Sequence, residues 1–153
     1  MSLAAWRLVR SELAERAFDG EGARLFGGRW NPPGQPAIYT AGSRALAALE
    51  VLTHLPRTLR TSAFVLYRVE FEEQAVEAVD PAALAPDWSA YPPPVSNQEL
   101  GLAWLQRAGR LVLRVPSVLI PEESNFLFNP RHPLFGRLRP ERERFFFFDP
   151  RLG

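Results

Sequence analysis

The sequence predicts a single domain of the α+β class. Its 153 residues suit one domain, and 46% hydrophobic against 23% charged residues is an ordinary globular composition. Six or seven strand candidates and two helix candidates follow one another without regular β–α–β alternation, and no internal repeat is present. Because that alternation is missing, α+β is favoured over a doubly wound parallel sheet, and we treat residues 1–153 as one domain.

The first elements are strand, loop and strand. Residues 4–10 alternate, which places Trp6 on one face of a short strand and Arg7 on the other, in a cleft or in water. Residues 19–34 contain so many glycines and prolines that we expect a shaped loop there. A second strand is expected over 36–40.

The first predicted helix follows Ser43, a candidate N-cap, and ends near Leu55, before Pro56. Apolar residues at helical spacing predict a buried stripe formed by Ala45, Ala48, Leu49, Leu52 and Leu55. Glu50 and His54 lie off this stripe, one turn apart. We therefore expect both on the side of the helix that is not fully buried.

The next elements are a strand, a connection and a second helix. Residues 62–71 are rich in β-branched and aromatic residues and form the clearest strand candidate. Five prolines forbid regular structure over 80–94, which is short enough to be an internal connection. Ser96 and Glu99 form a capping box, from which we expect a helix that ends near Gly109.

The C-terminal third predicts further strands. Residues 111–115 and 118–120 read as a strand interrupted at Pro116, where an edge strand or a bulge is expected. Two more strand candidates lie at 125–129 and 145–149.

Composition excludes several classes of protein. All 18 basic residues are arginine, and 17 acidic residues leave a net charge of +1, which argues against a general nucleic-acid coat. Without cysteine there is no disulfide framework, thiolate nucleophile or cysteine zinc site, and two histidines leave little for a metal cluster. No signal or membrane-spanning segment is apparent, so we expect a cytoplasmic protein. The use of arginine for every basic residue has two interpretations: codon usage in a GC-rich genome, or guanidinium groups that bind phosphate or carboxylate.

The first candidate binding feature is the loop Gly27-Gly28-Arg29-Trp30-Asn31. Paired glycines permit close backbone approach, arginine supplies a bidentate fork for phosphate, and tryptophan offers a stacking face. The alternative is a tight turn with a solvated arginine and a core tryptophan. The loop matches neither of the common nucleotide-binding glycine motifs.

The second candidate is Glu50, at the edge of an otherwise apolar helix stripe. There a carboxylate could stabilise a positively charged transition state or orient a nucleophile; the alternative is an exposed helix carboxylate. His54 is either the ion-pair partner of Glu50 or another residue on the same solvent-exposed face of the helix. We favour the exposed position without an ion pair.

Two further features have simpler interpretations. Ser117 follows a proline that could form a bulge, but it lacks the flanking glycines of a nucleophile elbow and is equally well a plain edge serine. The arginines near the C-terminus alternate with glutamates, which favours solvated surface or a partner contact: Arg137, Arg139, Arg142 and Arg144. The four phenylalanines at 145–148 are either buried on both faces or half covered by a partner.

Several segments in a fixed order carry a family resemblance. They are Gly-Ala-Arg-Leu-Phe-Gly-Gly-Arg-Trp-Asn-Pro-Pro-Gly at 22–34, Ala-Ile-Tyr-Thr-Ala at 37–41, 45–55 around the glutamate, Val-Pro-Ser at 115–117 and Asn-Phe-Leu-Phe-Asn-Pro-Arg-His-Pro at 125–133. In this order they resemble the RES domain, the toxin half of bacterial toxin–antitoxin pairs, which is named for an arginine, a glutamate and a serine. The resemblance extends over almost the whole chain.

The resemblance implies an ADP-ribosyltransferase-like fold, with mixed or antiparallel strands in two small sheets and flanking helices. It implies that NAD+ is bound as the substrate, without a metal, and that the bond between nicotinamide and ribose is broken. The acceptor in this family is water, inorganic phosphate or a protein side chain, and the residues do not decide among these. The implied partner is an Xre-type antitoxin, through which alone DNA would be contacted.

Carried over residue by residue, the family arginine falls on Arg29, its tyrosine on Tyr39 and its glutamate on Glu50. These would be the catalytic residues. Loss of neutral nicotinamide leaves an oxocarbenium-like ribose, which the Glu50 carboxylate could stabilise in the transition state. Tyr39 could stack on nicotinamide or its ribose.

The remaining carried-over residues would bind the dinucleotide. Arg7 matches a second family arginine and, with Arg29, would hold the pyrophosphate through charge-assisted bonds. Ser117 matches the family serine and could hydrogen-bond the ligand, and Asn129 is a further binding candidate. The leading hypothesis is an NAD+-consuming toxin. The alternatives are an ADP-ribosyltransferase that modifies one protein, or a non-enzymatic interaction domain.

Overall fold

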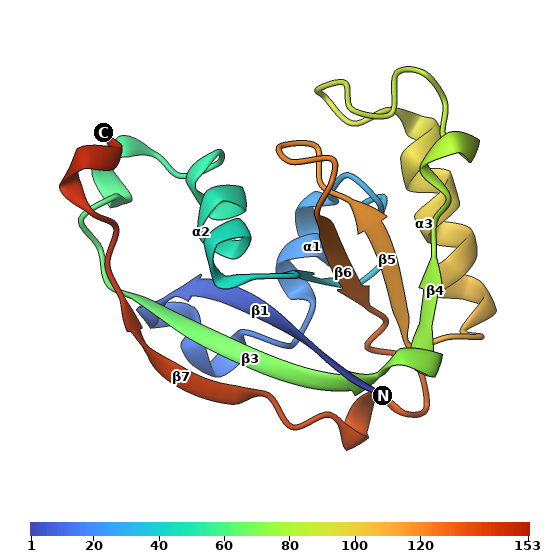
Figure 1. Ribbon diagram of the computed structural model, residues 1–153, viewed down its shortest axis with the longest axis horizontal. Coiled ribbons are helices and arrows are strands. Elements are labelled where there is room, and N and C mark those ends of the chain that lie inside the picture. Colours follow the sequence, from blue (N-terminus) through green and yellow to red (C-terminus); the bar gives the residue numbers. More distant parts are fainter.

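A computed structural model describes all 153 residues, and its seven strands form one mixed sheet in the order β4-β5-β6-β2-β1-β3-β7 (Figure 1). The strands are β1 Ser2–Arg10, β2 Ile38–Ala41, β3 Phe64–Glu72, β4 Val76–Ala78, β5 Val112–Pro116, β6 Ser124–Phe128 and β7 Glu141–Phe146. The α-helices are α1 Glu21–Phe26, α2 Arg44–Leu52 and α3 Val95–Arg107. Short 3₁₀ turns are η1 Ser11–Arg16, η2 Arg57–Leu59, η3 Glu73–Ala75, η4 Pro81–Ala83, η5 Phe135–Arg137 and η6 Pro150–Leu152. The α+β class is confirmed.

The sheet nearly divides between β1 and β2. These strands pair only at Trp6 and Ala41, whereas β1 pairs with β3 along its whole length. We expected two small sheets; instead the four-residue β2 joins both groups of strands, because it pairs with β6 on one side and β1 on the other. All neighbours are antiparallel except β4 and β5.

Separate apolar clusters hold the helices to the sheet. α2 packs on β1 and β3 through a cluster centred on Leu8, Phe64 and Leu66, and α3 packs on β5 and β6 through a cluster that includes Trp104 and Leu127. The two helices therefore lie over different parts of the sheet (Figure 1). No helix combines the length and the apolar composition needed to cross a membrane.

Part of the expected loop 19–34 is a helix, so that prediction is wrong for α1. The Asp19 side chain accepts a hydrogen bond from Glu21 N at 2.9 Å, and Gly20 has the left-handed φ of 73° that turns the chain into α1. After α1 the chain is irregular until β2, as expected.

The predictions for α2 are confirmed at its start and differ along its length. Ser43 caps the helix by accepting from Leu46 N at 3.0 Å, but α2 ends at Leu52, before the expected Leu55. Leu46 and Ala47 are buried, whereas Ala45 and Leu49 of the expected stripe are exposed. The stripe is shifted because α2 contacts Ala41 on β2 as well as the cluster on β1 and β3.

The capping box prediction for α3 is wrong in detail. The helix begins at Val95 after Pro94, which provides no side-chain cap, so Ser96 lies in the first turn. The expected C-terminus is confirmed, with Ala108 in the left-handed region at φ 50°. The proline-rich connection 80–94 holds only η4, as predicted.

The strand predictions after α3 need two corrections. β5 ends at Pro116 and residues 118–120 are not a strand. β5 is also not an edge strand: it lies between β4 and β6, and Pro116 is tolerated because β4 pairs only as far as Arg114. The sequence did not predict β4 at all.

The C-terminal strand β7 begins earlier than the expected 145–149 and ends at Phe146. Phe148 is buried, whereas Phe145 and Phe147 are 53% and 63% exposed, so alternate rings pack and the others face solvent. The four arginines near this strand are exposed, which fits solvated surface.

Candidate active site

Glu50 stands in the last turn of α2 and is held by two side chains from the other part of the sheet. Its Oε1 accepts hydrogen bonds from Ser117 Oγ at 2.7 Å and Asn125 Nδ2 at 3.0 Å. Its Oε2 has no partner within the protein, so one carboxylate oxygen is fixed and the other is left for a ligand. The prediction of an only partly buried Glu50 is confirmed, and the carboxylate is more than a solvated surface charge.

Ser117 lies behind Glu50. The residue is fully buried, and its Oγ accepts from Leu119 N at 3.1 Å and Ile120 N at 3.2 Å. A hydroxyl has one hydrogen, and here that hydrogen is donated to Glu50. In this structure Ser117 has neither exposed surface nor a free proton and holds the carboxylate, so the expected contact between Ser117 and the ligand stays a prediction.

Arg29 is held by the proline-rich connection. Its Nη1 donates to the carbonyl oxygens of Trp88 at 3.0 Å and Ala90 at 2.8 Å. Both hydrogens of Nη1 are therefore used, and the edge formed by Nε and Nη2 remains free, which is an edge that binds a carboxylate or phosphate through two bonds. Burial lowers the pKa of Arg29, and the negative charge of Glu50 opposes that shift, so the two charges act on each other.

Tyr39 anchors the loop that carries Arg29. Its hydroxyl donates to Asn31 Oδ1 at 2.6 Å and accepts from Trp30 N at 3.1 Å, and burial raises its pKa, which keeps the phenol neutral. Gly28 is needed beside it because a Cβ there would lie 2.6 Å from the Tyr39 hydroxyl oxygen. The hydroxyl is thus committed to the loop.

Asn31 is fully buried and completes this anchor, a role that the sequence did not predict. Its Nδ2 lies within hydrogen-bond distance of three backbone carbonyls, those of Ala23, Pro32 and Gln35. The loop is therefore fixed from inside, and Arg29 projects from a rigid base.

Arg7 lies on β1 and hydrogen-bonds the backbone of Tyr39, on the neighbouring strand β2. Its Nη1 donates to the Tyr39 carbonyl at 2.8 Å, and its Nε donates to the Ala17 carbonyl. Burial lowers the pKa of Arg7 to about 10, and the charge of Asp19 opposes this. Arg7 therefore supports the backbone at Tyr39 across the narrow junction of β1 and β2, and its expected contact with the pyrophosphate stays a prediction.

Two candidates do not join the group. Asn129 is buried at the opposite end of β6 from Asn125, about 13 Å along the strand. Its Nδ2 donates to the Leu105 carbonyl at 3.0 Å and its Oδ1 accepts from Arg131 N at 3.0 Å, which ties β6 to the end of α3. The expected ligand contact of Asn129 has no support in this geometry. His54 is exposed and makes no ion pair with Glu50, as favoured above.

Sequence reasoning missed Asn125. Asn125 is the first residue of the segment 125–133 that resembles the family. It pairs in the sheet with Ala41, which precedes α2, and this brings its side chain to Glu50. Its Oδ1 is buried without a hydrogen-bond partner. Asn125 thus donates one amide hydrogen to Glu50, and its own Oδ1 is left without a donor.

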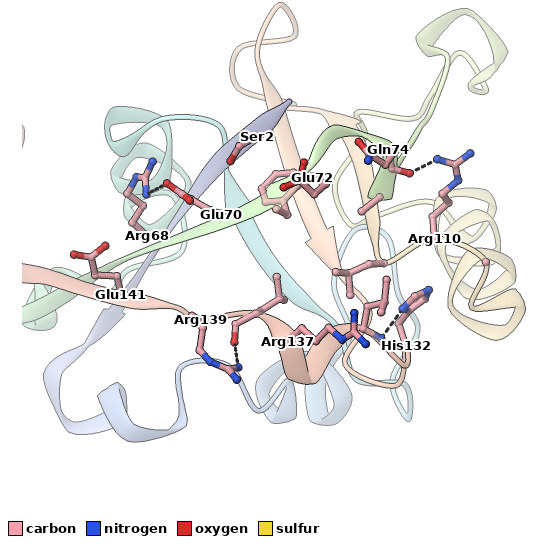
Figure 2. A pocket seen from close by; sticks show the side chains of 16 residues that line it. Ser2, Arg68, Glu70, Glu72, Gln74, Arg110, His132, Arg137, Arg139 and Glu141 are labelled. Carbon is pink, nitrogen blue, oxygen red and sulfur yellow. Dashed lines mark hydrogen bonds and ion pairs between the residues drawn. The ribbon is translucent and has the colours of Figure 1, made fainter.

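A separate cavity lies away from this group of residues. It has a volume of about 790 Å³, is bounded by β3, η3 and η5, and contains none of the predicted site residues (Figure 2). Its charged lining is mixed: Arg68, Arg110, Arg137 and Arg139 face Glu70, Glu72 and Glu141. Arg68 is paired with Glu70 at 2.7 Å, and Arg110 donates to the Gln74 carbonyl. Because this cavity contains none of the predicted site residues, we take the Arg29–Glu50 group as the candidate site. No cluster of three or more His, Cys, Asp or Glu residues is placed to hold a metal.

The chain is similar to known proteins along its whole length. The family model described as the RES domain matches residues 4–149. "Toxin Res" of Yersinia enterocolitica is 38% identical over 148 residues, which cover 96% of this chain and 97% of that protein. "Prs ADP-ribosylating toxin" of a Sphingobium species is 34% identical over 157 residues, covering 99% of this chain and 98% of that protein.

A third similar protein is known in sequence and structure. The "NAD(+) phosphorylase MbcT" of Mycobacterium tuberculosis is 39% identical over 69 residues, or 44% of this chain and 37% of that protein. In the crystal structure of the M. tuberculosis MbcT–MbcA toxin–antitoxin complex, one chain is similar to ours with a TM-score of 0.76 and 24% identity, covering 99% of this chain and 87% of that chain. This likeness shows that the two chains share a fold.

Proposed function

The chain belongs to the RES domain family, and from that premise we propose that it is an NAD+-cleaving toxin of a toxin–antitoxin pair. The observation that carries the proposal is the Glu50 carboxylate, which is fixed at one oxygen by Ser117 and Asn125 and free at the other. A free guanidinium edge of Arg29, whose charge interacts with that of Glu50, supplies the complementary anion-binding group. The name of a similar protein, NAD(+) phosphorylase, supports NAD+ as the substrate.

The proposed reaction breaks the bond between the nicotinamide nitrogen and C1′ of the ribose. Nicotinamide leaves as a neutral molecule with the bonding electron pair, and the ribose acquires oxocarbenium character. The free Oε2 of Glu50 stabilises that positive charge directly or accepts a hydrogen bond from a ribose hydroxyl. Either interaction is stronger in the transition state than in the substrate. A lone pair of the acceptor forms the new bond to C1′, and the acceptor loses a proton to solvent.

The other residues bind and orient. Arg29 binds the pyrophosphate through its Nε–Nη2 edge. Arg7 supports the Tyr39 backbone, and the Tyr39 hydroxyl holds the loop that carries Arg29. The Tyr39 ring remains the candidate for stacking on nicotinamide or its ribose. No step requires a metal.

A second candidate function is ADP-ribosylation of a specific protein. It is favoured by the 34% identity, over nearly the whole chain, to a protein named as an ADP-ribosylating toxin. The same bond is broken in both reactions, so Glu50 and Arg29 would have the same roles, and only the acceptor differs.

We also propose an antitoxin as the protein partner, since a similar chain was crystallised in a toxin–antitoxin complex. An antitoxin of the Xre type that covers the Arg29–Glu50 group would keep NAD+ out. Contact with DNA would then pass through the antitoxin.

The test is release of nicotinamide from NAD+ by the purified protein, in buffer alone, with inorganic phosphate and with a bacterial lysate. We expect release by the wild-type protein and its loss in folded Glu50→Gln protein. Phosphate-dependent release would identify a phosphorylase, and label from NAD+ that becomes attached to one protein would identify the second candidate. Wild-type protein that releases no nicotinamide in any of the three conditions would refute both.

A further inference from the structure

The arginine of the proposed site is aimed by a part of the chain that supplies none of the family-implied residues. Residues 80–94 form the proline-rich connection, and its Trp88 and Ala90 carbonyls hold Nη1 of Arg29. These contacts join residues 59 and 61 positions apart. The direction of the guanidinium therefore depends on how this connection is itself held.

The Trp88 carbonyl is held by Asn97, in the first turn of α3. Asn97 is 2% exposed, and its Nδ2 donates to the Trp88 oxygen at 2.7 Å. A carbonyl oxygen has two lone pairs, and here one accepts from Asn97 and the other from Arg29. Asn97 thus fixes the acceptor that in turn fixes Arg29.

Further contacts hold the arginine loop and the connection together. Gln98 Nε2 donates to the Gly28 carbonyl at 3.0 Å, and the rings of Trp30 and Trp88 stack at 6.3 Å with an interplanar angle of 27°. Gly101 allows this approach, because a Cβ there would lie 1.5 Å from the Trp30 carbonyl oxygen. The first turns of α3 therefore contact the backbone on both sides of Arg29, at Gly28 and at Trp30.

We propose that Asn97 is a positioning residue for substrate binding. By aiming the Trp88 carbonyl, it keeps Nη1 of Arg29 occupied and leaves the Nε–Nη2 edge directed at an anionic group of the substrate. The inference rests on the proposed function, in which that group is the pyrophosphate of NAD+.

The test is a double-mutant cycle in the dissociation constant for NAD+, measured by calorimetry in Glu50→Gln protein so that no turnover occurs. Asn97→Ala is expected to weaken NAD+ binding about tenfold in the presence of Arg29. In an Arg29→Ala background, the same change is expected to alter the dissociation constant less than about twofold, because the group that Asn97 positions is gone. A general structural role would give the same fold-change in both backgrounds.

A second substitution and a control accompany Asn97→Ala. Asn97→Asp fills the same space without the NH₂ donor, and it is expected to weaken binding at least as much as Asn97→Ala. Gln106→Ala, at an exposed position in the last turns of α3, is the matched control and is expected to leave NAD+ binding unchanged.

With Glu50 restored, Asn97→Ala is expected to raise KM for nicotinamide release about tenfold and to change kcat less than about threefold, because the pyrophosphate does not react. Unchanged binding in both Asn97 variants, or equal losses with and without Arg29, would overturn the inference. Tight NAD+ binding without nicotinamide release would overturn the proposed function and leave the inference standing. No NAD+ binding at all would overturn both.

Discussion

The two charged groups of the proposed site are held in different ways. Glu50 is fixed by side chains, Ser117 and Asn125, which donate to one of its oxygens from the end of β5 and from β6. Arg29 is fixed by backbone carbonyls of an irregular connection. The aim of the carboxylate thus depends on the identity of a few side chains, whereas the aim of the arginine depends on the shape of a loop. We expect the largest effects where a charged group itself is changed, and a smaller effect where a side chain that holds it is removed.

The largest effect is expected for Glu50→Gln. The amide keeps the size of the side chain but loses the negative charge that stabilises the oxocarbenium-like ribose, so kcat for nicotinamide release should fall by about 10²–10³. NAD+ binding should change far less. Nicotinamide release and calorimetry measure the two quantities, and a Glu50→Gln protein with more than a tenth of wild-type kcat would contradict the assignment.

Arg29→Lys should have the next largest effect, and on binding. Lysine keeps the charge but has no planar fork, so it cannot serve the Trp88 and Ala90 carbonyls and still offer two parallel bonds to phosphate. We expect KM for NAD+ to rise by about 10–100-fold, the loss of a hydrogen bond to a charged group. If kcat fell while KM stayed constant, Arg29 would act on the reacting ribose and not on the pyrophosphate.

Ser117→Ala separates orientation of the carboxylate from ligand contact. The substitution leaves the amides of Leu119 and Ile120 without their acceptor, so the free energy of unfolding in urea should fall by about 1–3 kcal/mol. The kcat should fall about tenfold because Glu50 keeps only its bond to Asn125. A rise in KM alone would instead support direct contact between Ser117 and the ligand.

The smallest effect is expected for Arg44→Ala, at the opposite end of α2 from the carboxylate. Arg44 binds Glu143 on β7 through two hydrogen bonds at 2.8 and 3.0 Å, and it holds the pKa of Glu143 below its ordinary value. A lowered carboxylate pKa stabilises the fold above the unfolded pKa, and this stabilisation is lost as the pH falls through the folded pKa. Arg44→Ala should therefore lower Tm slightly at pH 7, by less than Ser117→Ala.

The difference in Tm between Arg44→Ala and wild-type protein should shrink as the pH falls through the lowered folded pKa of Glu143, because below it Glu143 is protonated in both folded and unfolded chains. Nicotinamide release at neutral pH should be unchanged. A Tm difference that persists in acid would assign the effect to the packing of Arg44 on the Trp6 ring, 4.7 Å away, and not to the ion pair.

Local features were predictable from the sequence because their causes are local. The Ser43 cap, the strand over 64–72 and the proline-rich connection each follow from neighbouring residues or from a short periodic pattern. The order of motifs along the chain also identified the family and pointed to Arg29 and Glu50. These predictions required no knowledge of which segments meet in space.

The sequence could not supply what depends on long-range contacts. The carboxylate and its two donors are 67 and 75 residues apart, and only the order of strands in the sheet brings them together. Sequence alone could not show that Ser117 and Asn129 are buried, or that Asn129 hydrogen-bonds the Leu105 carbonyl at the end of α3. Residue type shows that a side chain can hydrogen-bond, but its partner is set by packing.

The sequence by itself determined the α+β class, the positions of the main helices and strands, and the family. Hydrophobic periodicity, caps and breakers act over a few residues, so they can be read along one chain. Only the tertiary structure decided that the seven strands form one sheet, that Ser117 orients the carboxylate, and that Asn97 aims the arginine through a backbone carbonyl. A backbone carbonyl is the same in every residue, so no sequence pattern can show which one will receive the guanidinium.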